Sequence, residues 1–161
     1  MIRDFQPADA ESILALNAAC EPEVGSMDAR KLDDLVEWAS VFFVVEVDGA
    51  VVGFLIGLIE GSDYQSPNYQ WFSSRYPSFA YVDRVAIDEA QRGAGWGPKL
   101  YREFEAWAVA QSKPVLCAEV NVVPPNPRSL RFHDLFGFDQ IEIFNPTGSM
   151  DYRVSMYAKT L

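Results

Sequence analysis

The order of apolar and polar residues along the chain predicts a mixed α/β fold. β-rich apolar runs alternate with segments whose apolar residues recur at helical spacing. In the first half, we expect strands at Ile2 to Gln6, Phe42 to Val47 and Val51 to Ile59, and helices at Pro7 to Ala19 and Asp28 to Ser40. The dipeptide Asp48-Gly49 lies between the second and third strands and predicts a tight hairpin turn.

The second half continues the alternation. We expect strands at Phe79 to Ile87, Val115 to Val120, Gly137 to Asn145 and Ser149 to Lys159. A helix beginning near Pro98 buries one face, and a short helix follows Asn126, a good N-cap, and ends at Gly137, a good left-handed terminator. The segment Glu60 to Pro77 is rich in turn residues, which predicts a long loop that can include one helical turn.

Composition limits the class of protein. The 161 residues suffice for one well-buried core, so we expect a single domain over residues 1–161. The start Met1 to Asp4 is unlike a signal peptide and no apolar run is long enough for a membrane span, so we expect a cytoplasmic protein without a membrane partner. A net charge of −10 argues against nucleic acid as a partner. Cys20, Cys117 and a single histidine offer no metal-binding spacing, so we expect no metal.

A glycine-rich loop follows the strand that ends at Ile87. Its sequence is Gln91-Arg92-Gly93-Ala94-Gly95-Trp96-Gly97. Glycines allow backbone N–H groups to turn inward together, and the next helix adds its positive end, which suits a pyrophosphate. A nucleotide-hydrolase P-loop would need Gly-Lys-Ser/Thr, and a dinucleotide fingerprint would need Gly-x-Gly-x-x-Gly, so neither fits.

The loop and a second motif together resemble the GNAT superfamily of acyl-CoA N-acyltransferases. Arg92, Gly95 and Gly97 match its pyrophosphate loop, Gln/Arg-x-x-Gly-x-Gly/Ala. The segment Asn126 to Phe138 matches its Asn-x-x-Ala-x-x-Phe-Tyr-x-x-x-Gly-Phe pattern, with Ser129 and Phe132 at the small and aromatic positions. The resemblance implies one mixed, mainly antiparallel sheet of six or seven strands with flanking helices and a splayed fourth and fifth strand.

The resemblance also implies acetyl-CoA as cofactor and a set of residues that bind it. A backbone amide of Val85 or Ala86 is the expected donor to the thioester oxygen. The expected cofactor-binding residues are Val85, Ala86, Ile87, Arg92, Gly93, Ala94, Gly95, Trp96, Gly97, Asn126, Ser129 and Phe132. The implied activity is N-acetylation of a small amine or an amino-acid-like acceptor. Acetylation of a protein N-terminus or lysine, and a non-catalytic CoA-binding module, are the alternatives.

Four residues are candidates for proton transfer. Asp83, Glu119 and Tyr81 lie on the two central strands and are candidates for the general base, although family members also deprotonate the amine through water. His133 stands where the family has the tyrosine that protonates the departing thiolate, and it could instead be a structural residue. Because free imidazole is only partly protonated at neutrality, we expect an acid role to need a nearby anion such as Asp134 or Glu119.

The aromatic residues of the segment Tyr64 to Tyr76 are the candidates for acceptor recognition. Tyr64, Tyr69, Trp71 and Phe72 could wall a pocket or attract an amine through cation–π contact. They could equally cover a sheet edge or form the contact of a homodimer. The acidic surface would favour a cationic small-molecule acceptor, or it provides solubility alone.

Overall fold

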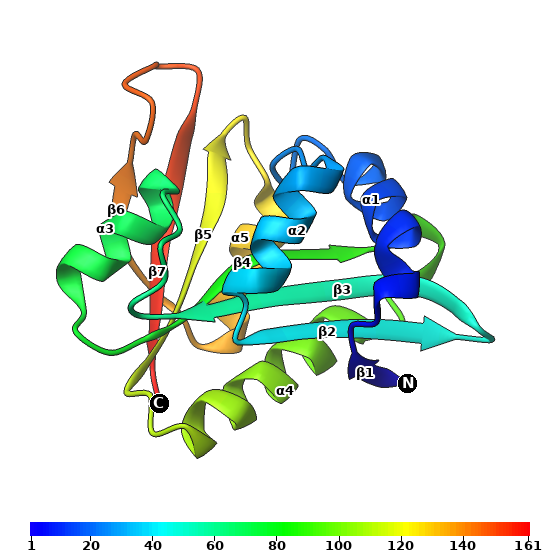
Figure 1. Cartoon of the computed structure of the whole chain (residues 1–161). Coiled ribbons are helices and arrows are strands. Elements are labelled where there is room, and N and C mark those ends of the chain that lie inside the picture. Colours follow the sequence, from blue (N-terminus) through cyan, green and yellow to red (C-terminus); the bar gives the residue numbers. More distant parts are fainter. The chain divides into compact units, whose positions relative to one another are not determined.

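The structure is a computed structural model that describes all 161 residues. It contains a seven-stranded sheet with the strand order β1-β2-β3-β4-β5-β7-β6 (Figure 1). The strands are β1 Ile2–Asp4, β2 Val41–Val47, β3 Ala50–Ile59, β4 Ala80–Ile87, β5 Val115–Val123, β6 Asp139–Phe144 and β7 Arg153–Thr160. The helices are α1 Ala10–Ala19, α2 Ala29–Trp38, α3 Pro67–Arg75, α4 Trp96–Ala110 and α5 Pro127–Phe136, with 3-10 turns at Pro7–Asp9 and Glu89–Gln91.

The sheet is mixed and mainly antiparallel, as predicted. The pairs β1–β2, β2–β3, β5–β7 and β6–β7 run antiparallel, whereas β4 and β5 run parallel. The parallel register joins only Ala80–Val82 of β4 to Leu116–Ala118 of β5. The backbone of β4 beyond Val82 therefore takes no part in this ladder.

The chain divides into two compact units. The first consists of Met1–Leu58 and Asp83–Trp107. Within it, α1 and α2 cover one face of β2 and β3, and α4 covers the other (Figure 1). Gly57 permits the close approach of α4, because a Cβ at this position would collide with the ring of Phe104. The predicted hairpin turn is confirmed, with positive φ at both Asp48 and Gly49.

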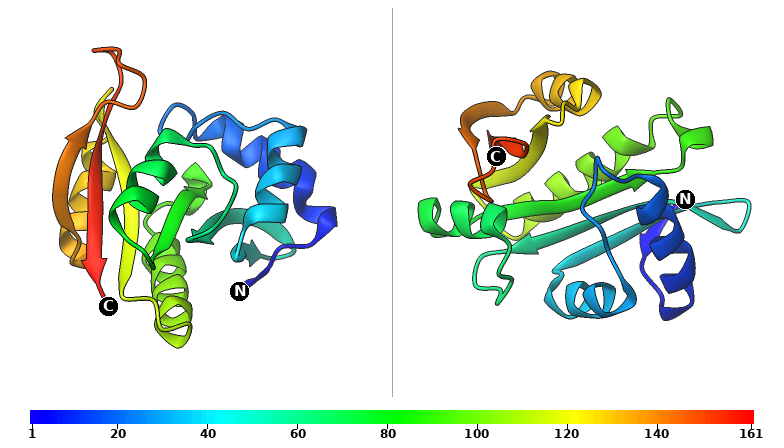
Figure 2. Two further views of the ribbon diagram at one scale, coloured as in Figure 1. Left: turned by 60° about the vertical axis from the view of Figure 1, so that its left-hand side comes forward. Right: turned by 90° about the horizontal axis from the view of Figure 1, so that it is seen from above.

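The second unit consists of Ile59–Val82 and Ala108–Leu161. Its strands β5, β7 and β6 carry α3 on one face and α5 on the other (Figure 2). Glu119 of β5 is cross-strand partner to Met156 of β7 and contacts α3, whereas the next residue of β7, Tyr157, stacks on His133 of α5. Successive residues of a strand point to opposite faces, so Glu119 and His133 lie on opposite sides of this sheet.

One sequence expectation about this unit is wrong. The sequence predicts a long loop with one helical turn over Glu60 to Pro77, but Pro67–Arg75 form a nine-residue helix, α3. Pro67 occupies the first helical turn, where its missing N–H costs nothing. Tyr69 and Phe72, three residues apart, are 1% and 0% exposed, so burial of one aromatic face stabilises a helix of low intrinsic propensity.

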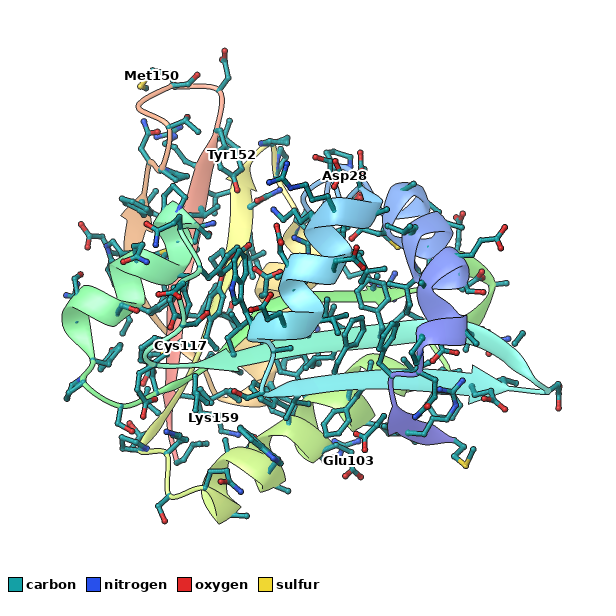
Figure 3. The ribbon with its side chains drawn as sticks, viewed as in Figure 1. Asp28, Glu103, Cys117, Met150, Tyr152 and Lys159 are labelled. Carbon is teal, nitrogen blue, oxygen red and sulfur yellow. The ribbon has the colours of Figure 1, made fainter.

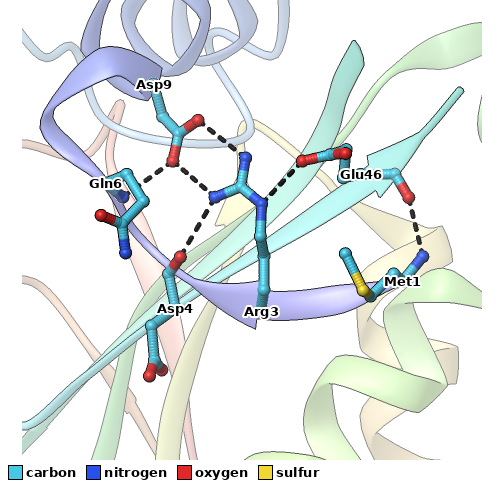
Figure 4. Close-up of polar contacts among 6 residues, drawn as sticks. All are labelled: Met1, Arg3, Asp4, Gln6, Asp9 and Glu46. Carbon is cyan, nitrogen blue, oxygen red and sulfur yellow. Dashed lines mark hydrogen bonds and ion pairs between the residues drawn. The ribbon is translucent and has the colours of Figure 1, made fainter. Parts of the chain in front are cut away.

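Arg3 fastens the first strand to its surroundings (Figure 4). Its guanidinium donates to both carboxylate oxygens of Asp9, at 2.8 and 2.9 Å, and its Nε donates to Glu46 at 2.7 Å. The backbone N–H of Gln6 also donates to Asp9. These bonds to Arg3 are the main reason that the pKa of Asp9 lies below its ordinary value of 3.8.

We expect Asp9→Asn to lower the free energy of unfolding at pH 7 by about 1–3 kcal/mol, the range for a hydrogen bond to a charged group. A carboxylate whose pKa is depressed in the folded state stabilises above its unfolded pKa and loses this contribution as the pH falls through the folded value. The difference between variant and wild type should therefore shrink below about pH 3.8. Urea unfolding of both proteins at pH 7 and pH 3 measures this difference in the free energy of unfolding. A difference that is the same at both values would contradict the assignment.

Candidate active site

The glycine loop leads from the end of β4 into α4. Gly93 and Gly95 have φ of +87° and +83°, a region that side chains other than glycine rarely adopt. Before them, the Asp88 carboxylate accepts from the Ala90 N–H at 2.8 Å and caps the 3-10 turn. The Lys99 N–H donates to the Gly95 carbonyl at 3.1 Å and begins the helical hydrogen bonding of α4.

This loop fits a pyrophosphate. An added Cβ at Gly93, Gly95 or Gly97 would meet no atom within 4 Å, so open space lies in front of the backbone. The first N–H groups of α4 have no acceptor within the helix and point toward that end, as does the positive end of its dipole. Arg92 is exposed, and the Lys99 ammonium lies over the Trp96 ring at 4.4 Å.

The C-terminal part of β4 presents backbone groups in two directions. The Asp88 N–H donates to Val52 on β3, and the Ala86 carbonyl lies against Gly53 of β3. Backbone direction alternates along a strand, so the N–H groups of Val85 and Ile87 point away from β3. Of the two expected donors to a thioester oxygen, Val85 therefore has the suitable direction and Ala86 faces β3.

We expect Gly95→Val to weaken CoA binding by about 5- to 150-fold, because a β-branched side chain at this φ shifts the loop at a cost of about 1–3 kcal/mol. Gly49→Val is the matched control: Gly49 has φ +80° in a hairpin turn and open space around it. Calorimetric titration with CoA should detect the loss in the first variant and none in the second. Equal affinity in Gly95→Val and wild type would remove the loop from the cofactor site.

Glu119 is the centre of a polar cluster on the α3 face. Its Oε1 accepts from the Tyr81 hydroxyl at 2.9 Å and from the Asn68 amide at 3.2 Å. Burial raises the pKa of Cys117, on the same strand, and that of Tyr152, just before β7 (both labelled in Figure 3). The negative charge of Glu119 raises both pKa values further. Two of the predicted catalytic residues, Tyr81 and Glu119, are thus hydrogen-bonded to one another.

Asp83 is placed differently, in the first unit. Its carboxylate pairs with Arg84 at 2.7 Å, and both side chains are at most 5% exposed. Arg84 also donates to Asn17 and to the Gly25 carbonyl, which ties β4 to the segment after α1. The carboxylate of Asp83 therefore neutralises a buried guanidinium. A role of Asp83 or Glu119 as the general base remains a prediction.

His133 is buried between aromatic rings, with an exposed fraction of 2%. It stacks on Tyr157 and meets Phe132 and Phe138 edge to face. Burial lowers its pKa from 6.5 to about 4, an effect that the Ser129 carbonyl and Asp134 only partly offset. The carbonyl can only accept, so Nδ1, at 2.7 Å from it, carries the proton. The imidazole is neutral at pH 7, which does not favour the expected acid role.

The other predicted residues of the second motif lie on α5. Asn126 caps the helix by accepting from the Ser129 N–H at 3.3 Å, and Gly137 ends it with φ +93°. Phe132 stacks on Phe136 and contacts His133. The boundaries expected for this helix are confirmed, and a contact of these residues with the cofactor remains a prediction.

The aromatic residues expected to recognise an acceptor are mostly in the core. Tyr64, Tyr69 and Phe72 are 7%, 1% and 0% exposed, and the Tyr69 hydroxyl donates to the Ile59 carbonyl at 2.7 Å. Trp71 is half-buried, lies under the Arg75 guanidinium at 4.5 Å and faces Phe144. These rings hold α3 to the sheet. An acceptor contact remains a prediction, for which Trp71 is the most accessible of the four.

Sequence reasoning missed Asn68, Tyr152 and Tyr157. Asn68 lies in the segment that the sequence predicts to be a loop, and it belongs to no recognisable motif. Tyr157 donates a hydrogen bond to Asp134 at 3.2 Å and lies beside His133, where burial raises its pKa. Only the strand pairing brings these side chains to the predicted residues. No pattern in the sequence could have indicated them.

The fold and the loop define the class of protein. The sequence matches the model of the Acetyltransferase (GNAT) family over residues 10–138. The chain belongs to this family. None of its helices is both long and apolar enough to span a membrane.

Solved structures agree with this fold. Ard1 from Thermoplasma volcanium is 23% identical with a TM-score of 0.81, covering 100% of this chain and 97% of that one. Chaetomium thermophilum Naa20, solved with a bisubstrate analogue, is 22% identical with a TM-score of 0.78 and coverages of 100% and 86%. Ribosomal-protein-alanine N-acetyltransferase from Brucella melitensis is 21% identical with a TM-score of 0.76 and coverages of 100% and 99%. No curated protein matches the sequence.

Proposed function

We propose that this protein transfers the acetyl group of acetyl-CoA to the primary amine of a small molecule or an amino-acid-like acceptor. The observation that carries the proposal is the carboxylate of Glu119, held in place by Tyr81 and Asn68 on the α3 face. A fixed carboxylate attracts an ammonium group and can take its proton. The formal net charge of −10 further favours the approach of a cation.

Acetyl-CoA supplies an acyl group activated as a thioester. The amides at the start of α4, with Arg92, would hold its pyrophosphate, and the outward backbone groups of Val85 and Ile87 would pair with its pantetheine arm. The Val85 N–H would donate to the carbonyl oxygen as negative charge develops there. Binding of the thioester and the amine to one protein would lower the barrier through proximity, which can be worth about 7–11 kcal/mol.

Glu119 takes a proton from the acceptor's ammonium, and the neutral amine attacks the carbonyl carbon. A C–N bond forms, the C–S bond breaks, the nitrogen loses a second proton to water, and the departing thiolate gains one. His133 is neutral at pH 7 and already donates its Nδ1 proton to the Ser129 carbonyl. We therefore assign the protonation of the thiolate to water, and His133 to the support of α5 against β7.

A thiol-release assay with acetyl-CoA and a panel of amines tests the proposal. The panel should contain simple primary amines, amino-acid amides and short peptides with free N-termini. We expect turnover with the first two groups. Peptide N-termini are the second candidate, since the neighbours in structure include N-terminal and ribosomal-protein alanine acetyltransferases. Binding of CoA without turnover of any amine would instead support a non-catalytic module.

A further inference from the structure

Asn68 stands out as a buried polar residue with an atom that no group of the protein satisfies. It lies in the first turn of α3 and is 8% exposed. Its amide nitrogen donates to Glu119 Oε1 at 3.2 Å, and a hydrogen bond from the same side chain lowers the pKa of Tyr152 against the larger effects of burial and of Glu119. The contact with Glu119 needs a donor on Asn68, because an ionised carboxylate can only accept.

The orientation of the Asn68 amide follows from its hydrogen bond to Glu119. The NH₂ group is directed to Oε1 of Glu119 at 3.2 Å, because a carboxylate oxygen can only accept. The carbonyl oxygen Oδ1 is therefore fixed on the opposite side of the group. It is buried and has no hydrogen-bond partner. A buried acceptor without a donor costs free energy, which a ligand with an N–H group would recover.

We propose that Asn68 recognises the acceptor amine, with Oδ1 accepting an N–H of a primary ammonium whose charge is balanced by Glu119. This inference rests on the proposed function and adds the residue that selects a primary ammonium. A primary ammonium carries three N–H donors, and the cluster offers acceptors on Asn68, Glu119 and Tyr152. A quaternary ammonium has the same charge but no donor, so only the primary ammonium gains from Oδ1.

The charged groups near Asn68 and Glu119 favour a cationic ligand. Glu119 is the carboxylate that faces it from β5, and Tyr152 and Tyr81 contribute hydroxyl groups. On α3 itself the one basic side chain, Arg75, lies over Trp71 and forms an ion pair with Glu142 at 3.8 Å. Arg75 is thus engaged on β6 rather than with Glu119.

Ligand-detected NMR on the full-length protein can test the inference without catalysis. The probes are n-butylammonium and tetramethylammonium, titrated into wild type, Asn68→Leu and Asn68→Ala. We expect both variants to bind n-butylammonium about tenfold more weakly than wild type and tetramethylammonium equally well. Ser74→Ala, an exposed change on the same helix, is the control and should leave both affinities unchanged.

The outcomes distinguish recognition of the ammonium by Asn68 from a role of Asn68 in orienting Glu119 alone. Equal weakening of both probes would mean that Asn68 only orients Glu119, and unchanged binding of n-butylammonium would remove it from the site, so either result overturns the inference. Thermal unfolding of each variant identifies any general loss of structure. Because leucine and alanine differ in size, an effect common to both variants comes from loss of the amide rather than from bulk. If wild type binds the primary ammonium through Asn68 but releases no thiol from acetyl-CoA, the proposed function fails although Asn68 still forms an ammonium-binding site.

Discussion

Replacing Glu119 with glutamine should lower kcat by about 10²- to 10⁴-fold, the usual contribution of a general base. The change keeps the size of the side chain and an oxygen that can still accept from Tyr81 and Asn68. It removes the charge and the ability to take a proton. The rate of the variant should recover as the pH rises toward the pKa of the acceptor, because the amine then arrives neutral.

The control for Glu119→Gln is Glu142→Gln. Glu142 and Glu119 are both cross-strand partners of Met156, and Glu142 is exposed at the edge strand β6. This variant removes the same charge at a distance from the cluster, so its kcat should equal that of wild type. Steady-state kinetics across pH with one primary amine measures both. A Glu119→Gln enzyme with wild-type kcat would show that water alone removes the proton.

The second large effect concerns stability rather than activity. His133 has a pKa of about 4 in the folded protein and an ordinary value of 6.5. Between these values the unfolded state binds more protons, so the free energy of unfolding contributed by His133 falls as the pH is lowered from 6.5 toward 4. At 1.36 kcal/mol for each unit of difference, the full loss is about 3 kcal/mol.

His133→Phe should abolish this part of the acid sensitivity. Wild type should be the more pH-sensitive protein, with the difference in unfolding free energy between wild type and variant changing by about 3 kcal/mol from pH 7.5 to pH 4. Phe138→Leu, which alters a ring packed against His133 but no titrating group, should show a constant difference. Chemical denaturation at several pH values measures all three. A constant difference for His133→Phe would mean that the imidazole is solvated and titrates with its ordinary pKa in the folded protein.

Local sequence determines the parts of this fold that were predicted well. Positive φ at Gly93 and Gly95, the cap at Asn126 and the terminator at Gly137 all follow from properties of single residues and their neighbours. Such features need no knowledge of the rest of the chain. The strand positions and the hairpin at Asp48-Gly49 follow from equally local patterns.

The failures have a common physical origin in contacts between distant segments. Helix α3 is stabilised by burial of Tyr69 and Phe72, which the turn-rich composition around them conceals. His133 occupies a motif position for proton transfer, yet Tyr157, 24 residues further along, helps to bury it and to keep it neutral. Asn68 reaches Glu119 across 51 positions of sequence. Neither the spacing of residues nor the composition predicts these contacts between distant segments.

The stoichiometry of the reaction tests the central claim most directly. Wild-type protein is incubated with acetyl-CoA and the best primary amine of the panel, and free thiol and acetylated amine are quantified together, the second by mass spectrometry. We predict one molecule of acetylated amine for each thiol released, and little of either product with Glu119→Gln at neutral pH. Thiol release without acetylated amine, or no product with any amine despite CoA binding, would contradict an N-acetyltransferase.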